Sequence, residues 1–136
     1  MAGTLSTHWP KEGISDDDWL YMRVHVQWLL PDGSPKPGAF RNHPPEKKGG
    51  LSMSTDWSKY ASPEDARRRA RVPVENAVIR MRVGVVRRVP RQRVEHSPDV
   101  DHRAHTDVVG PKDNNLEARL KLLEASDVVI SATNPL

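Results

Sequence analysis

The sequence contains no cysteine among its 136 residues. Disulfide bonds and thiolate metal sites are therefore excluded, and the absence is typical of a reducing compartment. No apolar run reaches the roughly 18 residues of a membrane-spanning helix, and the first residues, MAGTLSTHWPKEG, lack the apolar stretch of a signal peptide. We therefore expect a cytoplasmic protein with no membrane segment.

Common catalytic and nucleotide-binding motifs are also missing. The chain has no glycine-rich phosphate loop, no nucleophile elbow and no H-E-x-x-H zinc motif. Aromatic residues are scarce, seven in all, and none follows residue 60. The sequence therefore predicts no cofactor, and its function has to be inferred from the distribution of charge and polar side chains.

Charge is strongly segregated along the chain, although its formal net value is only +3. Residues 67–93 hold ten arginines and a single acid, Glu75, whereas both flanking regions of the chain are acidic. Such a block can bind phosphates, and arginine stacking on bases favours RNA or single-stranded ligands. Alternatively, the acidic flanks can pair with the arginines within the fold or across a homodimer interface.

Hydrophobic patterning predicts two long strands and two helices. Apolar and polar residues alternate over 20–30 and again over 77–89, as expected of strands with one buried face. Ser62, Pro63 and two following acids are typical of a helix start, and this helix should end before Pro73. Leucines at helical spacing predict a second helix over 114–126, with Asp113 as a candidate cap.

Shorter strands are expected at 51–54, 92–96, 106–109 and 127–131, with 92–96 returning antiparallel to the strand before it. The proline- and glycine-rich segment 31–50 is predicted to be a loop or lid. Together these elements predict one α+β domain spanning residues 1–136, with a mixed, mostly antiparallel sheet and two helices.

A cluster of histidines and aspartates between residues 96 and 107 is the first candidate site. A loop of this composition can supply an imidazole general base oriented by a carboxylate, and we predict His102, His105 and Asp107 as catalytic residues. The same residue types can instead hold a divalent metal or cap turns in solvent. Without a metal-binding motif, we predict no metal site.

The second candidate is a phosphate-binding surface built from the first long strand and the arginine block. Arg23 and His25 lie two residues apart, so both side chains point to one face of the predicted strand. Guanidinium groups bind phosphate with two parallel hydrogen bonds. The predicted ligand-binding residues are Arg23, His25, Arg80, Arg82, Arg87, Arg88, Arg91 and Arg93.

A few residues occur in an order that resembles the ADP-ribosyltransferase group. Members of that group carry an arginine or histidine on an early strand, a Ser-Thr-Ser-like strand and a later glutamate. Here the corresponding residues are Arg23, the run Ser52-Met53-Ser54-Thr55, and either Glu75 or Glu95. The resemblance implies that Arg23 contacts the phosphates of a dinucleotide, that Ser54 orders the site and that the glutamate activates the acceptor.

Three functions follow from these patterns. The first is a small domain that binds a phosphate-bearing ligand or nucleic acid, with RNA favoured. The second is an enzyme that acts on a nucleotide, by ADP-ribosyltransferase-like or histidine acid–base phosphoryl chemistry. The third is an interaction subunit of a homodimer or larger complex, and the sequence leaves open whether the protein is an enzyme.

Overall fold

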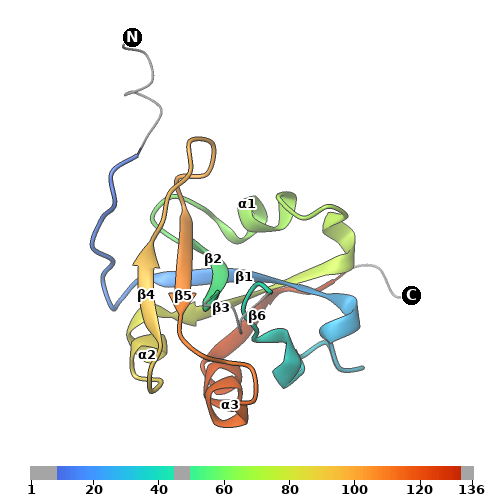
Figure 1. The fold of residues 1–136 in the computed structure, drawn as a ribbon. Helices are drawn as coiled ribbons and strands as arrows, with labels where there is room; N and C mark the ends of the chain where they lie inside the picture. Colours follow the sequence, from blue (N-terminus) through green and yellow to red (C-terminus); the bar gives the residue numbers. More distant parts are fainter. Residues whose placement is uncertain (1–8, 45–49, 133–136) are drawn as a thin grey trace.

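A computed structural model of the chain describes residues 9–44 and 50–132. Within these residues six strands form one antiparallel sheet in the spatial order β4-β5-β2-β1-β3-β6 (Figure 1). The strands are β1 (Trp19–His25), β2 (Ser52–Trp57), β3 (Asn76–Arg82), β4 (Arg93–His96), β5 (His105–Val109) and β6 (Ser126–Ile130). The α-helices are α1 (Pro63–Arg68), α2 (Val83–Arg87) and α3 (Leu116–Glu124), with short 3-10 turns at Val26–Trp28, Pro37–Ala39 and Pro73–Glu75.

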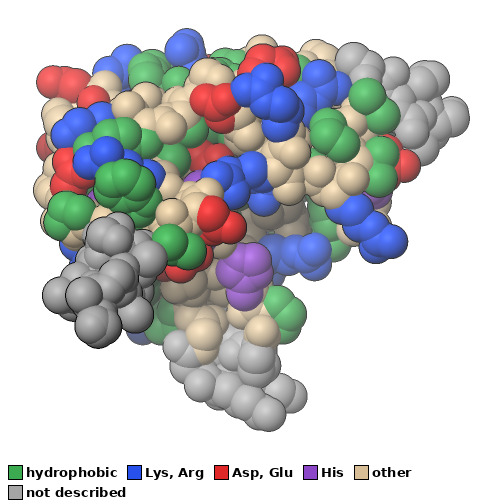
Figure 2. Space-filling model, turned by 90° about the horizontal axis from the view of Figure 1, so that it is seen from above, with side chains coloured by type: hydrophobic (Ala, Val, Ile, Leu, Met, Phe, Trp, Pro, Cys, Tyr) green, Lys and Arg blue, Asp and Glu red, His purple; other side chains and the backbone are tan. Residues whose placement is uncertain are grey.

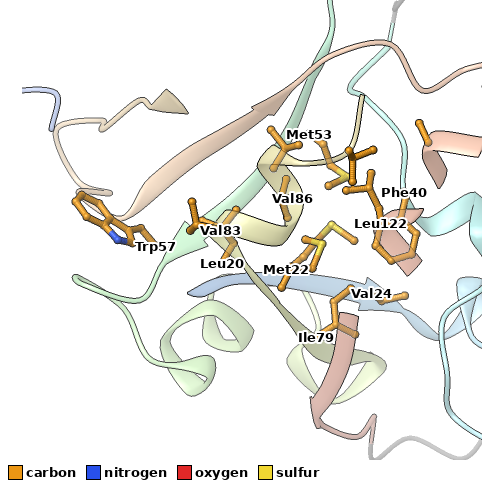
Figure 3. Close-up of a cluster of buried hydrophobic side chains, with 14 of the residues drawn as sticks. Leu20, Met22, Val24, Phe40, Met53, Trp57, Ile79, Val83, Val86 and Leu122 are labelled. Atoms are coloured by element: carbon orange, nitrogen blue, oxygen red, sulfur yellow. The ribbon is translucent and has the colours of Figure 1, made fainter. Parts of the chain in front are cut away.

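One face of the sheet carries the hydrophobic core. Every second residue of β1 points to this face, and all three of these side chains are buried: Leu20, Met22 and Val24. Helices α2 and α3 cover it, as Figure 3 shows for their labelled side chains Val83, Val86 and Leu122. Non-directional burial of this apolar surface supplies most of the favourable free energy of folding.

The opposite face of the sheet is polar and only partly covered. Helix α1 lies over β1 and β3 on this side (Figure 1), where Arg23 Nη1 donates to the carbonyl oxygen of Ala66 at 2.9 Å. Next to α1, strands β2 and β5 place Ser54, Asp56 and His105 on the uncovered part of the face. The fold therefore leaves a row of buried and half-buried polar side chains between α1 and the edge of the sheet.

A buried lysine fastens the β1–β2 connection to the end of β5. The Lys112 side chain is fully buried, and its Nζ donates to Asn42 Oδ1 at 2.6 Å and to the carbonyl oxygens of Val108 and Gly110 at 3.0 Å. Asn42 Nδ2 also donates to Gly110 O at 2.9 Å. Since a buried ammonium is tolerated only when it is hydrogen-bonded, these contacts fix the path of residues 39–44.

The predicted α+β class, with one small domain, is confirmed, and so is most of the predicted element order. Helix α1 begins after Ser62 in a capping box with Asp65. Strand β4 forms as predicted, but it pairs with β5 and not with the strand before it. Asn115, not Asp113, caps α3, because its side chain accepts from the Ala118 amide at 3.1 Å.

Both long strands end earlier than the alternation indicated. In the β1–β3 ladder His25 lies opposite Asn76 and Trp19 lies opposite Arg82, so each strand stops where its partner begins. The predictions of strands over 20–30 and 77–89 are therefore wrong in their second parts. The ends of both strands are set by the hydrogen bonds between β1 and β3, which are far apart in the sequence.

Residues 83–87 form helix α2 where a strand was predicted, which gives three helices where two were expected. The turn before β1 accepts the first free amides of this helix: Val83 N donates to Asp18 O, and Gly84 N to Asp16 O, both at 2.9 Å. Val83 and Val86 are three positions apart and both buried, a spacing that places them on one face of a helix but would place them on opposite faces of a strand.

The segment predicted as a lid is anchored over its described part. Phe40 is fully buried in the core, Ala39 packs against the core, and the His43 N–H donates to the carbonyl oxygen of Ser52 at 2.9 Å. Residues 45–49 of this predicted loop lie outside the described residues. In the described ranges, no helix is long and apolar enough to cross a membrane.

We predict that Gly110→Ala strongly destabilises the fold. Gly110 has a φ of +154°, and a Cβ added there would lie 2.2 Å from the carbonyl oxygen of Arg91. Relieving this clash requires the backbone of residue 110 to move, which displaces its carbonyl oxygen from Lys112 and Asn42. We expect the free energy of unfolding to fall by about 3 kcal/mol. Urea unfolding followed by circular dichroism measures the change.

Gly13→Ala is the matched control, because nothing lies within 4 Å of its added Cβ. It should change the unfolding free energy by less than about 0.5 kcal/mol. Equal unfolding midpoints for the two variants would show that the close approach at Gly110 is unimportant.

Candidate functional site

A cleft of about 350 Å³ opens on the polar face of the sheet. Its floor comes from β1, β2 and β5, one wall comes from the β1–β2 connection, and the other comes from the turn before β5. The cleft therefore joins side chains that are up to 84 positions apart in the chain. Its polar and charged lining residues are Tyr21, Arg23, Arg41, Asn42, His43, Ser54, Thr55, Asp56, His102 and His105.

The centre of the cleft is a serine hydroxyl held between two histidines. Ser54 Oγ lies 2.8 Å from His43 Nε2 and 3.1 Å from His105 Nε2. His105 Nδ1 lies 2.9 Å from the carbonyl oxygen of Ser97, which can only accept, so this nitrogen carries the proton. His105 Nε2 is then the acceptor of the Ser54 O–H, and Ser54 Oγ accepts in turn from His43 Nε2–H.

A further contact orients the His105 ring. Ser97 Oγ lies 3.0 Å from His105 Nδ1, and the Ser97 hydroxyl donates to Asp107 Oδ2 at 2.8 Å. Asp107 Oδ1 lies 3.8 Å from His105 Nε2. An imidazole held in one tautomer by a second group, with its other nitrogen facing a hydroxyl, is the arrangement that general-base catalysis requires.

His43 reaches the cleft because the connection that carries it is fixed on both sides. Its backbone N–H donates to the carbonyl oxygen of Ser52 at 2.9 Å, which ties it to the start of β2. Its neighbour Asn42 is held by Lys112. The ring is therefore placed over Ser54 by backbone and buried contacts, and not only by its own hydrogen bond.

The wall next to His105 is a buried histidine–carboxylate pair. His102 Nε2 lies 2.8 Å from Asp56 Oδ1, and the two side chains are 15% and 6% exposed. Burial lowers the pKa of His102 from its usual 6.5, against the opposing effect of Asp56. Asp56 Oδ2 is buried and accepts no hydrogen bond from any described residue.

Two arginines give the cleft positive charge. Arg23 extends from β1 beside α1, and Arg41 lies over the Trp28 ring with 4.5 Å between its guanidinium carbon and the ring centroid. Among the described residues that line the cleft, Asp56 is the one carboxylate, and His102 already occupies one of its oxygens. The arrangement favours an anionic ligand.

Among residues 9–44 and 50–132, no group of three or more histidine, aspartate and glutamate side chains is placed to hold a metal ion.

The structure brings together the three residues predicted to be catalytic. The rings of His102 and His105 lie 5.3 Å apart between centroids, and Asp107 contacts His105 through Ser97. His96, from the same sequence cluster, is buried and does not line the cleft. Its Nδ1 accepts from the Glu12 N–H, and its Nε2 contacts the carbonyl oxygen of Arg103. The tight turn between Asp99 and His102 places His102 beside His105.

Most of the predicted phosphate-binding residues do not reach the cleft. Arg23 does, but His25 lies outside it, 3.4 Å from Glu75 Oε1. The guanidinium groups of Arg80 and Arg82 lie on the Trp19 ring, at 4.0 Å and 4.1 Å from its centroid. The two predicted phosphate-binding arginines of β3 are therefore occupied by contacts within the fold.

The arginines that follow β3 are dispersed. Arg87 Nη1 binds Asp16 Oδ1 at 2.6 Å, and Arg93 Nε binds Glu95 Oε2 at 3.0 Å. Arg88 lies in the hollow between α2 and α3, on the other side of the sheet, and Arg91 adopts a φ of 68° in the turn after α2. Pairing within the fold accounts for much of this arginine block.

Sequence reasoning missed His43 and Asp56 as site residues, and it included Ser54 only through the ADP-ribosyltransferase resemblance. Alternation over β2 would have placed Ser54 and Asp56 on one polar face. No local signal pairs His43 with them. Neither Glu75 nor Glu95 lines the cleft, so the resemblance is not completed by a glutamate beside Ser54.

Comparison of the chain with protein-family models finds no match. The curated proteins and the solved structures likewise give no match.

We predict that His102 makes stability fall at mildly acidic pH. Because its pKa is lowered in the fold, the unfolded chain binds a proton more readily as the pH falls through 6.5, and unfolding is favoured. The contribution of His102 to the free energy of unfolding is therefore retained above pH 6.5 and lost as the pH falls below it. Urea midpoints at pH 7.5 and 5.5 measure the difference.

His102→Gln should reduce this pH-dependent loss, because the amide can still donate to Asp56 Oδ1 but does not titrate. An equal loss of stability between the two pH values in the wild type and in His102→Gln would exclude His102 as its source.

Proposed function

We propose that the protein is an acid–base enzyme that cleaves phosphate esters in the cleft. The observation that carries this proposal is the contact of both His43 Nε2 and His105 Nε2 with the Ser54 hydroxyl. The two distances limit the separation of these nitrogens to about 6 Å. A group bound above Ser54 can therefore face both imidazoles at once.

Phosphoryl transfer needs a proton acceptor on the attacking oxygen and a proton donor on the leaving oxygen, which lie roughly in line. The hydrogen-bond pattern supports one distribution of these roles. His105 Nε2 is unprotonated and acts as the base, and His43 Nε2–H acts as the acid. The Ser54 hydroxyl donates to a phosphoryl oxygen once the substrate has displaced the histidine contacts.

Positive charge in the cleft supports a phosphorylated substrate. Arg23 has one nitrogen bound to the Ala66 carbonyl oxygen, which leaves other guanidinium donors for the ligand. Developing charge on the phosphoryl oxygens is stabilised by such fixed cations. This proposal unites the predicted histidine chemistry with the one predicted phosphate-binding arginine that lies in the cleft.

Nucleophilic catalysis by Ser54 is the second candidate, favoured by the same hydrogen bond from Ser54 to His105 and by the orientation of His105 through Ser97. A phosphonylating reagent distinguishes the two functions. A stable mass increase on the peptide that contains Ser54 supports the covalent route, and its absence during turnover of phosphate esters supports acid–base catalysis.

The cytoplasmic location and a homodimeric or larger assembly remain sequence predictions.

We expect the protein to cleave dinucleoside monophosphates, whose alkoxide leaving oxygen has to be protonated as it departs. His105→Gln and His43→Gln should each lower kcat/KM by about a hundredfold or more, since each removes one proton-transfer group.

Ser52→Ala is the control, because Ser52 lies on the same face of β2, two positions before Ser54, and does not line the cleft. Its activity should match that of the wild type. Failure of the protein to hydrolyse any ester in a panel of phosphomonoesters and phosphodiesters, or activity that survives both histidine substitutions, would refute the acid–base proposal.

A further inference from the structure

Two grooves continue from the cleft along helix α1. The first shares Arg23 with the cleft and runs beside Arg71 and Asn76. The second shares His102 with the cleft and runs beside Tyr60 and Arg103. Arg69 lines both grooves, so the cleft and the two grooves are neighbouring parts of one depression around α1, separated by shared side chains.

Arginines dominate this depression. Its acidic lining residues are Asp56, Asp65 and Glu75, and its arginines are Arg23, Arg41, Arg68, Arg69, Arg71 and Arg103. Seen from the side of α1, Lys and Arg side chains lie in several groups across the surface, with an exposed histidine among them (Figure 2). A ligand longer than one phosphate ester would meet positive charge on either side of the cleft.

Three of these arginines pair with no carboxylate among the described residues, so their charge is available to a ligand. Arg23 and Arg69 donate only to backbone carbonyl oxygens, those of Ala66 and Asp101, at 2.9 Å and 2.8 Å. Arg71 has no hydrogen-bond or ion-pair partner among the described residues. They differ in this from arginines such as Arg68, Arg87 and Arg93, each of which pairs with a carboxylate.

The aromatic surface of the second groove is already occupied by contacts within the fold. The guanidinium carbon of Arg103 lies 4.0 Å from the ring centroid of Tyr60 and 4.4 Å from that of Trp9, and Arg103 Nη2 lies 3.6 Å from Glu12 Oε2. Recognition of a ligand by this depression therefore rests on its charge and on the size of the cleft. The cleft, at about 350 Å³, is at the lower end of the range for small-molecule sites, and its size suits one nucleotide unit better than a base pair.

From these observations, and on the basis of the proposed phosphate-ester chemistry, we propose that the substrate is single-stranded RNA. Its flanking phosphates bind Arg23, Arg69 and Arg71, and the scissile phosphate lies between His43 and His105. The ribose supplies its own nucleophile, the 2′-hydroxyl, which DNA lacks.

The reaction is an internal transfer. His105 Nε2 takes the proton of the 2′-hydroxyl, the 2′-oxygen forms a bond to the adjacent phosphorus, and the bond from phosphorus to the 5′-oxygen breaks. His43 Nε2–H then protonates the leaving 5′-oxygen. The products are a 2′,3′-cyclic phosphate and a 5′-hydroxyl end, and no other reactant is consumed.

Binding is measured apart from cleavage by using the His105→Gln variant and a fluorescent single-stranded RNA of about twelve nucleotides, within the usual site sizes of such proteins. Fluorescence anisotropy should show binding that weakens as salt rises. Adding Arg69→Ala and Arg71→Ala should weaken it at least tenfold at low salt and lower the slope of log affinity against log salt by about 1.4, as expected for two lost phosphate contacts.

The control is the same variant with Arg88→Ala and Lys121→Ala, which removes two cations from the hollow between α2 and α3 on the other side of the sheet. Its RNA affinity should be unchanged. Equal weakening by both pairs of substitutions, or no binding at low salt, overturns the RNA groove. Equally tight binding of duplex RNA overturns its single-stranded character.

Cleavage by the wild-type protein is tested on the same RNA and on DNA of the same sequence. Mass spectrometry should find 2′,3′-cyclic phosphate ends from RNA and intact DNA. Arginine-dependent RNA binding without cleavage would support the groove and refute the acid–base proposal. Hydrolysis of small phosphate esters without RNA binding would support the acid–base proposal and refute the groove.

Discussion

The candidate site depends on the ammonium group of Lys112, buried at the end of β5. Its bonds to Asn42 and to two backbone carbonyl oxygens join a proline-rich connection to a strand almost 70 positions later. Removing such a charge from water is costly unless oxygen atoms replace the lost water, so the connection has little freedom to move away. His43, one residue beyond Asn42, is therefore brought to β2 by an interaction on the buried side of the sheet.

Much of the fold could be predicted from the sequence because its signals are local. The Ser62 capping box and the leucines of α3 indicated their helices without reference to the rest of the chain. The ends of β1 and β3 could not be predicted, since they depend on which strands pair. Helix α2 was missed because Val83 and Val85 continue the alternation of Ile79 and Met81, whereas the helix is favoured by carbonyl oxygens of the turn before β1, which accept its first amides.

The same division holds for the candidate site. His102, His105 and Asp107 lie within one short stretch, so their composition alone marked them, and the alternation of β1 marked Arg23. His43 and Ser54 come together only through the path of the β1–β2 connection. The arginine block misled for an electrostatic reason: net charge along a sequence does not show which guanidinium groups find carboxylates or aromatic rings after folding. Arg80 and Arg82, both on the Trp19 ring, illustrate this.

The two histidines at Ser54 come from elements that differ in their tolerance of sequence change. His105 lies on a strand with a neighbour on each side, where an insertion would shift the register of the ladder. His43 lies on a connection between strands, and connections accept insertions and substitutions more readily. In a lineage of such proteins, one wall of the cleft can therefore diverge while its floor is preserved. Ligand preference can change through substitutions at exposed positions of this connection, such as Arg41, with the sheet and the buried anchor inherited intact.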